Sequence, residues 1–192
     1  METDFGDYYA WGETEPYYLA GHAYDNPCVD WKDGKSAGYE WASYKFKDGW
    51  DWLRYSGSDY DTLLPEDDAA HASCGGAWRM PTHQEWQELA SSCSWVWKTT
   101  ADGFANNGYL ITSNVAGYES NSIFLPAAGR RGSTYFDNNP PDWGNYWSSS
   151  IAGTSGGAVE KAKALNFYSN SISLNNVTTR YTGLPIRSVI AD

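Results

Sequence analysis

Side chains that carry metal and thiol chemistry are scarce in this chain. Its 192 residues include three histidines, three cysteines and two methionines. The cysteines, Cys28, Cys74 and Cys93, show no CxxC or CxxxH spacing, so the sequence predicts no zinc site. Cys74 and Cys93 could form a disulfide in an exported protein, but reduced, buried cysteines are the default. His71 and His83 lack a His-x-x-x-His pair and are interpreted as solvent-exposed residues of two helices.

Long apolar runs and basic residues are also missing. No run approaches the roughly 20 apolar residues of a membrane-spanning helix, and no signal peptide is recognisable. Because the first four residues are typical of an internal cut, the missing signal says little about location. Lys and Arg total 13 against 24 Asp and Glu, and residues 1–75 carry the whole net charge of −11. An acidic surface repels phosphate backbones, so nucleic acid is not an expected partner.

Aromatic residues, by contrast, are abundant, with 11 Trp and 15 Tyr. Large rings with polar edges suit loop-rich packing as well as binding surfaces. Residues 1–65 show many turn signals and little periodicity, yet they are rich in rings, whereas disordered linkers are poor in them. We interpret this segment as ordered loops held by aromatic packing, followed by a helical and scaffold part over residues 66–131. The length predicts a single domain over residues 1–192.

The clearest local signal is the start of a helix. Gly75–Gly76 allows a tight turn, and Pro81 prevents the preceding segment from continuing as a helix. Thr82 and Glu85 then have the spacing of a capping box, in which each side chain satisfies a backbone amide of the first turn. The pattern predicts a helix over residues 83–92.

A second, shorter helix is predicted over residues 66–73, with Asp67 and Asp68 in its first turn as capping side chains. Short runs bounded by Gly, Asn, Ser or Pro then predict strands. They are Ser94–Trp97, Tyr109–Thr112, Ser122–Leu125, Gly144–Ser149, Ala164–Tyr168, Ser171–Leu174 and Leu184–Ile190. Two helices followed by short strands predict an α+β domain.

Several blocks carry a resemblance to known proteins. The stretch Gly76–Trp86 resembles the formylglycine-generating-enzyme-like branch of C-type-lectin-like folds, where an Arg-Leu-Pro-Thr-x-x-Glu-Trp segment opens a helix. Further blocks resemble the Fibrobacter succinogenes major paralogous domain, which is abundant in exported proteins of gut Bacteroidetes. These blocks are Tyr8–Thr14, Asp67–Ala70, Phe124–Gly129, Tyr146–Ser150 and Gly183–Val189, the last with Ser188 where the family has proline. The resemblance implies a C-type-lectin-like fold with two helices, a small mixed or antiparallel sheet and long ordered loops.

The same fold carries the variable proteins of diversity-generating retroelements. In those proteins, mutagenesis directed at adenines diversifies residues near the C-terminus. Residues 132–182 hold 7 of the 12 Asn of this chain and are dense in Ser, Thr, Gly and Tyr. This composition fits a diversified region, and it equally fits the polar loops of an ordinary domain.

Enzymatic chemistry finds little support. The formylglycine generator needs a reactive cysteine pair in its C-terminal part, and the last cysteine here is Cys93. The related sulfoxide synthases need a histidine-rich iron site, which three scattered histidines do not provide. The glycine-rich run Gly153–Gly157 has no Walker spacing and is interpreted as a flexible loop. Arg79 and Arg187 are expected to pair with a carboxylate or with loop carbonyls. No cofactor is predicted, although Asp137–Asn145 has oxygens suited to calcium and a structural calcium stays open.

Binding is therefore the predicted function. Rings and short amides make good contact surfaces because they lose little side-chain entropy when they are buried. The candidate ligand-binding residues are Tyr135, Asn138, Asn139, Asp142, Asn145, Asn166, Tyr168, Asn170, Asn175, Asn176 and Tyr181. Alternation in Ala164–Tyr168 places Leu165 and Phe167 inward and Asn166 and Tyr168 outward.

The expected partner is a protein or a glycan met outside the cell, on a cell surface or a phage particle. The chain could reach such a surface through a lipid anchor outside this segment. Its oligomeric state is not predicted. The alternatives are a structural domain of an exported lipoprotein, a carbohydrate-binding adhesin and, last, an enzyme.

Overall fold

The chain forms an α+β structure in which short antiparallel strands outnumber helices. The computed structural model describes residues 5–16, 44–56, 60–131, 136–137, 142–153 and 159–191. Within these residues the helices are α1 (Ala69–Cys74) and α2 (His83–Ser92), with 3₁₀ turns at Pro65–Asp67 and Thr100–Asp102. The predicted candidates Tyr135, Asn138 and Asn139 lie outside the described residues.

The strands pair antiparallel in several small sheets. The bounds are β1 (Lys47–Asp48), β2 (Asp51–Trp52), β3 (Trp78–Arg79), β4 (Cys93–Lys98), β5 (Gly108–Ser113), β6 (Ser122–Pro126), β7 (Arg130–Arg131), β8 (Phe136–Asp137), β9 (Trp143–Ile151), β10 (Lys161–Tyr168), β11 (Ser171–Thr179) and β12 (Val189–Ile190). The two larger sheets have the orders β11-β10-β9 and β4-β5-β6. The pairs β1-β2, β3-β12 and β7-β8 form small sheets of their own.

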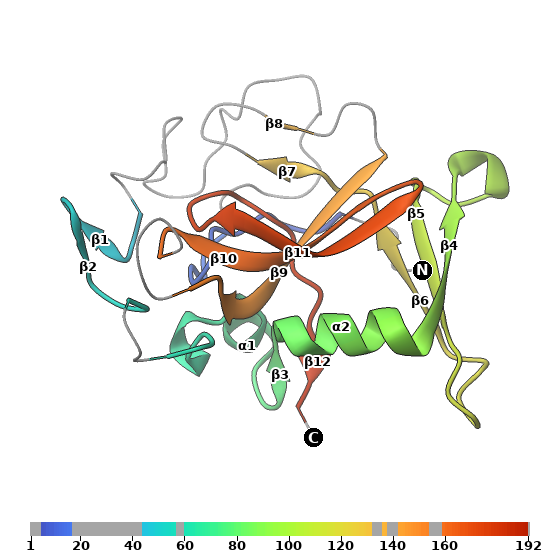
Figure 1. The fold of residues 1–192 in the computed structure, drawn as a ribbon, viewed down its shortest axis with the longest axis horizontal. Helices are drawn as coiled ribbons and strands as arrows, with labels where there is room; N and C mark the ends of the chain where they lie inside the picture. The colour runs from blue at the N-terminus through green and yellow to red at the C-terminus, as the bar shows by residue number, and fades with distance from the viewer. Residues whose placement is uncertain are drawn as a thin grey trace.

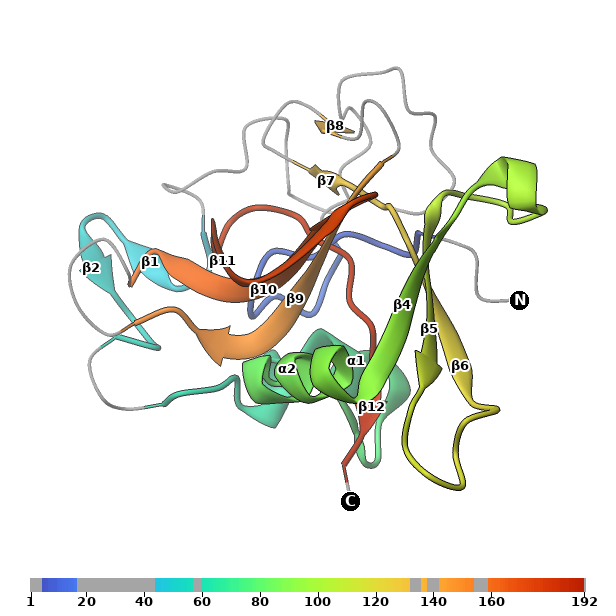
Figure 2. The ribbon, with the colours of Figure 1, turned by 45° about the vertical axis from the view of Figure 1, so that its right-hand side comes forward.

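The sheet of β9, β10 and β11 lies in the middle of the molecule. Figure 1 shows α2 along one side of this sheet and β7 and β8 on the other. Figure 2 shows β4 rising from the end of α2 and the β4-β5-β6 sheet standing beside the central sheet. The central sheet is therefore packed from two sides.

Helix α2 begins and ends where the sequence predicts. Thr82 Oγ1 accepts from the Glu85 amide at 3.2 Å, and Glu85 Oε2 accepts from the Thr82 amide at 2.7 Å, which is the complete capping box. Arg79 donates two hydrogen bonds to the same carboxylate, at 2.6 and 2.7 Å. Arg79 thus pairs as expected, and Arg187 donates to the Phe124 carbonyl at 3.0 Å.

The capping carboxylate predicts an acid-sensitive helix start. The hydrogen bond from Arg79 lowers the pKa of Glu85 to about 2, below the value of about 4.3 in an unfolded chain. The ionised Glu85 carboxylate therefore stabilises the folded state fully above about pH 4.5, and this stabilisation is lost as the pH falls toward 2. Between pH 4.5 and pH 2, the free energy of unfolding of wild type should fall by about 1–2 kcal/mol more than that of Glu85→Gln. This loss is smaller than the full pKa shift implies, because the ion pair is partly open to solvent.

Urea unfolding at pH 5, 4, 3 and 2 measures this difference, and Glu88→Gln is the matched control. Glu88 lies on the exposed side of α2, where its carboxylate accepts only from Gln84 at 2.9 Å among the hydrogen bonds found in the structure. Glu88→Gln should follow the wild-type pH profile. Parallel profiles for wild type and Glu85→Gln would contradict the prediction.

The predicted helix over residues 66–73 is divided at Asp68. Asp68 has extended angles (φ −94°, ψ 112°), so a 3₁₀ turn ends there and α1 begins after it. Its side chain caps α1, as the sequence predicts for this acid. Asp67 has a different role from capping: its buried carboxylate accepts from Lys45 at 2.7 Å, Arg54 at 2.6 Å and Tyr55 at 2.7 Å.

Six of the seven predicted strands coincide with observed strands. Five differ by up to three residues at an end, and Ser171–Leu174 covers only the first part of β11, which continues to Thr179. The exception is Leu184–Ile190, where only Val189–Ile190 forms a strand. Pro185 has no amide to donate, and its carbonyl accepts instead from Trp147 N at 3.2 Å. Residues 184–188 are therefore held by individual contacts and not by the hydrogen-bond ladder of a β-sheet.

The central sheet has a buried cluster on each face. One cluster joins Trp147 and Ala164 to the first part of the chain, including Trp11, Tyr44 and Tyr55. The other cluster packs Trp86 of α2 against Tyr146, Leu165 and Phe167. The described parts of residues 1–65 are thus held by rings, as the composition predicts.

Arg180 contacts members of the first cluster and is fully buried. Its guanidinium lies 4.8 Å from the Trp11 ring centroid and 4.9 Å from that of Trp52, and it donates to the Tyr55 carbonyl at 2.9 Å. Burial lowers the pKa of Arg180 to about 10. The arginine therefore ties the end of β11 to the N-terminal loops.

The cysteines and histidines of the described residues differ in exposure from the sequence predictions, since Cys74 is exposed and Cys93 half-buried where buried cysteines were expected. Cys74 and Cys93 are both free, so the alternative of a disulfide between them is not realised. The prediction that His71 and His83 are exposed is wrong, because both are half-buried. His83 packs near Lys163, and burial followed by this positive charge lowers its pKa.

Candidate functional site

One face of the central sheet changes along its length from buried core to open polar surface. Residues directly opposite each other on antiparallel strands share a face. From the open end to the buried end, the pairs between β9 and β10 on this face are Trp143–Tyr168, Asn145–Asn166 and Trp147–Ala164. The first cluster covers the Trp147 end, and the other pairs lie beyond that cover.

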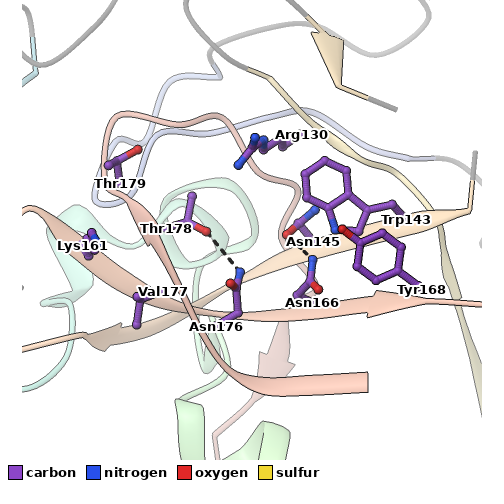
Figure 3. A pocket seen from close by; sticks show the side chains of 10 residues that line it. All are labelled: Arg130, Trp143, Asn145, Lys161, Asn166, Tyr168, Asn176, Val177, Thr178 and Thr179. Atoms are coloured by element: carbon purple, nitrogen blue, oxygen red, sulfur yellow. Dashed lines mark hydrogen bonds between the residues drawn. The ribbon is translucent and has the colours of Figure 1, made fainter. Parts of the chain in front are cut away.

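A hollow of about 330 Å³ opens over this part of the sheet. Figure 3 shows the side chains from β9, β10 and β11 that gather around it, with Arg130 of β7 above them. Its lining consists of Arg130, Trp143, Asn145, Lys161, Asn166, Tyr168, Asn176, Val177, Thr178 and Thr179. We call this the amide–aromatic hollow.

The aromatic end of the hollow is a stack of three groups. Trp143 and Tyr168 lie nearly parallel, at 7° and with ring centroids 5.9 Å apart. The Arg130 guanidinium lies 4.9 Å from the Trp143 ring centroid. The backbone of Tyr168 is fixed because its carbonyl accepts from Tyr109 OH at 3.0 Å. The stack therefore offers ring surface and positive charge at one place.

The middle of the hollow is a set of short amides. Asn166 Nδ2 donates to Asn145 Oδ1 at 2.9 Å, and Asn176 Nδ2 donates to Thr178 Oγ1 at 3.3 Å (Figure 3). These bonds hold the amides in defined orientations on a rigid sheet. Such preorganised polar groups beside an apolar surface are typical of ligand pockets.

The charge of the hollow is opposite to that of the whole chain. Among its described lining residues, Arg130 and Lys161 are cationic and none is acidic, whereas the chain as a whole carries −11. A second hollow of about 340 Å³ lies between the N-terminal loop and α1, and Asp7 and Glu15 are in its lining. None of the predicted candidates lines that second hollow.

Four of the predicted candidates meet in the amide–aromatic hollow: Asn145, Asn166, Tyr168 and Asn176. The inward and outward alternation predicted for β10 is confirmed, since Leu165 and Phe167 are buried and Tyr168 is 43% exposed. The prediction that Asn145 is exposed is wrong, because its side chain is 1% exposed. Asn145 is the third residue of β9 and lies opposite Asn166 of β10.

The other described candidates lie elsewhere. Asn170 and Asn175 are exposed, at the turn after β10 and on β11, and Asp142 is half-buried just before β9. Tyr181 packs against the first cluster and is not on an open face. The candidate group therefore does not form one continuous surface within the described residues.

Sequence reasoning missed six lining residues: Arg130, Trp143, Lys161, Val177, Thr178 and Thr179. Alternation along β9 carries a signal for Trp143, which is two residues from Asn145 and so shares its face. Thr178 could be placed only through its register opposite Ala162. Arg130 comes from another sheet, and no local pattern points to it.

No group of three His, Cys, Asp or Glu side chains that could hold a metal ion occurs in the part of the chain that the structure describes. Much of the segment Asp137–Asn145, considered for calcium, lies outside that part. No helix among the described residues has the length and apolar character needed to cross a membrane.

Comparison with known proteins returned no relative of this chain: no family model, no curated protein and no solved structure matches it.

Proposed function

We propose that this chain is a C-type-lectin-like domain that binds a protein or glycan ligand outside the cell and catalyses no reaction. The α+β architecture with two helices and small antiparallel sheets is compatible with that fold. The resemblance at residues 76–86, where the capping box of α2 is formed, also favours it. The ligand surface is the amide–aromatic hollow.

One observation carries this proposal: amides and a ring predicted from three separate sequence segments converge on the same hollow. Asn145, Asn166 and Asn176 come from β9, β10 and β11, and Tyr168 closes one end. A sheet packed from both sides keeps these groups in place, so little ordering is needed on binding. The lining offers hydrogen bonds, ring surface and positive charge, which are the means of recognition.

A binding screen with a variant of Tyr168 tests the proposal. Wild type and Tyr168→Ala are applied to arrays of glycans and of extracellular proteins, with Asn170→Ala as the matched control. Loss of the exposed ring should weaken binding of any ligand held in the hollow about tenfold or more, because buried aromatic contacts dominate such sites. Asn170 lies outside the hollow, so its variant should bind like wild type. Equal binding by all three proteins would overturn the proposed site.

The sharpest version of the proposal is a receptor diversified by a retroelement, on a cell surface or a phage. The Asn-rich composition of residues 132–182 supports it. In this version, side chains such as Asn166 and Asn176 vary while β10 and β11 keep their backbone. Sequencing around the gene tests it. A near-identical template repeat that differs at adenines, beside a reverse transcriptase, is the expected result, and absence of both would remove this version.

A further inference from the structure

Two hydrogen-bond donors are buried in the wall of the amide–aromatic hollow. No described residue places an acceptor within hydrogen-bond distance of Asn145 Nδ2 or of Trp143 Nε1. Asn145 is 1% exposed, and its Oδ1 is already engaged by Asn166. Buried donors in native proteins are paired with few exceptions. Two unpaired buried donors within one hollow therefore indicate that a ligand supplies the acceptor.

The kind of group follows from the kind of atom. Both unpaired atoms are N–H donors, so the ligand must bring oxygens that accept. A carboxylate accepts at two oxygens and has no proton to place, whereas a hydroxyl must also find an acceptor for its own proton. Hydrogen bonds to an ionised acceptor are also the stronger ones.

The local charge favours an anion. The Arg130 guanidinium lies against the Trp143 ring that carries one of the two donors, and Lys161 lines the same hollow. No acidic side chain is among the described lining residues, although the chain is strongly acidic. A positive hollow on an acidic protein offers an anionic group a favourable local potential.

The rest of the lining suits a sugar better than a peptide strand. Asn166 and Asn176 each use one N–H inside the wall, and their amide oxygens suit hydroxyl groups, which both donate and accept. The ring of Tyr168 offers an apolar surface for the C–H face of a sugar. An extended peptide is commonly bound along a free strand edge, whereas this hollow lies on the face of β9, β10 and β11.

We infer that the amide–aromatic hollow binds the carboxylate of an acidic sugar, with Asn145 Nδ2 and Trp143 Nε1 as its donors and Arg130 as the neighbouring charge. The inference rests on the proposed function and gives it a ligand class. Because both donor atoms are covered in the unliganded structure, the side chains around them must open slightly before the carboxylate pairs with them, and the sugar ring stays above among the amides.

Nuclear magnetic resonance of the full chain labelled with ¹⁵N tests the inference. The probes are sodium glucuronate and sodium galacturonate, the matched neutral sugars glucose and galactose, and the peptide N-acetyl-Glu-Glu-amide, all at equal ionic strength and pH 7. An acidic sugar should shift the indole N–H of Trp143 and the side-chain amide of Asn145. The matched neutral sugar should bind at least about tenfold more weakly, which corresponds to about 1.4 kcal/mol.

Variants then assign the donors. Asn145→Asp replaces the donor with a carboxylate and should weaken binding of the acidic sugar about tenfold or more. Asn175→Asp makes the same exchange at an exposed position of β11 outside the hollow and should leave binding unchanged. Trp143→Phe keeps a smaller aromatic ring and removes the indole N–H, so it provides a second test if Asn145→Asp does not fold.

Three results would overturn the inference. Neutral sugars that bind as tightly as acidic ones would show that the carboxylate is not recognised. Shifts caused by the peptide and by no sugar would identify a protein partner. Long-lived contacts of both N–H groups with water in the presence of each sugar would assign the donors to structural water. In each case Tyr168-dependent binding on the arrays would still stand, so failure of the ligand class is distinct from failure of the proposed function.

Discussion

Asp68→Ala should lower the free energy of unfolding by about 3–4 kcal/mol. The Asp68 carboxylate accepts from the amides of Ala70 at 2.9 Å, His71 at 3.1 Å and Met80 at 2.8 Å. Two of these bonds start α1, and the third fixes the strand segment that precedes α2. Ala70 and Met80 are buried, so their amides cannot turn to water when the carboxylate is removed.

Asp68→Asn separates the two roles of this side chain. An amide oxygen can still accept at the start of α1, but the amide nitrogen cannot accept from Met80, so we expect an intermediate loss of about 1–2 kcal/mol. Asp102→Ala is the matched control, because Asp102 also bonds a helix-start amide, that of Thr99 at 2.8 Å, but in an exposed turn. Urea titrations give the three free energies. If Asp68→Ala were no less stable than Asp102→Ala, the cross-link to Met80 would have no energetic weight.

Local signals of the sequence predicted local structure. The capping box at Thr82 and Glu85 depends on residues three apart, and α2 follows it over its whole length. The strands β4, β5, β6 and β10 are bounded by turn residues, so each could be placed from its own segment. Asp68, by contrast, was predicted to cap a helix that starts earlier. Its carboxylate also accepts a hydrogen bond from the amide of Met80, twelve residues away, and no local pattern reports this contact.

Strand alternation predicted two members of the candidate site and their exposed position. Asn166 and Tyr168 follow from the alternation of β10. Asn145 was placed on an exposed face because its burial depends on Arg130 and on the neighbouring strand, which no local pattern reports. Trp143, Thr178 and the two cations belong to the hollow through register and tertiary packing alone. Composition indicated that the site would be rich in amides and aromatic rings, whereas strand pairing determined which residues line it.

Gly144→Ala should lower the free energy of unfolding by about 3 kcal/mol and weaken ligand binding at the same time. Gly144 lies opposite Phe167 on the face that packs on α2. A Cβ built at this glycine would overlap the Phe167 ring. The ring cannot move aside easily, because it is fully buried and packs against Tyr109 at 5.3 Å and Tyr146 at 6.2 Å between ring centroids.

A double-mutant cycle shows whether the Phe167 ring is the cause. Phe167→Ala alone should cost about 3–5 kcal/mol by opening a cavity. In the Gly144→Ala background it should cost at least about 1 kcal/mol less, because the smaller side chain relieves the overlap. Additive losses in urea unfolding would mean that the added methyl group acts elsewhere.

The same substitution connects the core to the candidate site. Gly144 stands between Trp143 and Asn145, whose side chains point to the opposite face and line the hollow. If β9 moves away from β10 to accommodate the methyl group, the bond between Asn145 and Asn166 and the stack of Trp143 on Tyr168 both lengthen. We therefore expect the Trp143 indole resonance to shift in the unliganded variant. Array binding should fall about tenfold under conditions in which the variant is still folded. A destabilised variant with an unchanged Trp143 resonance and full binding would show that the hollow does not depend on the packing beneath it.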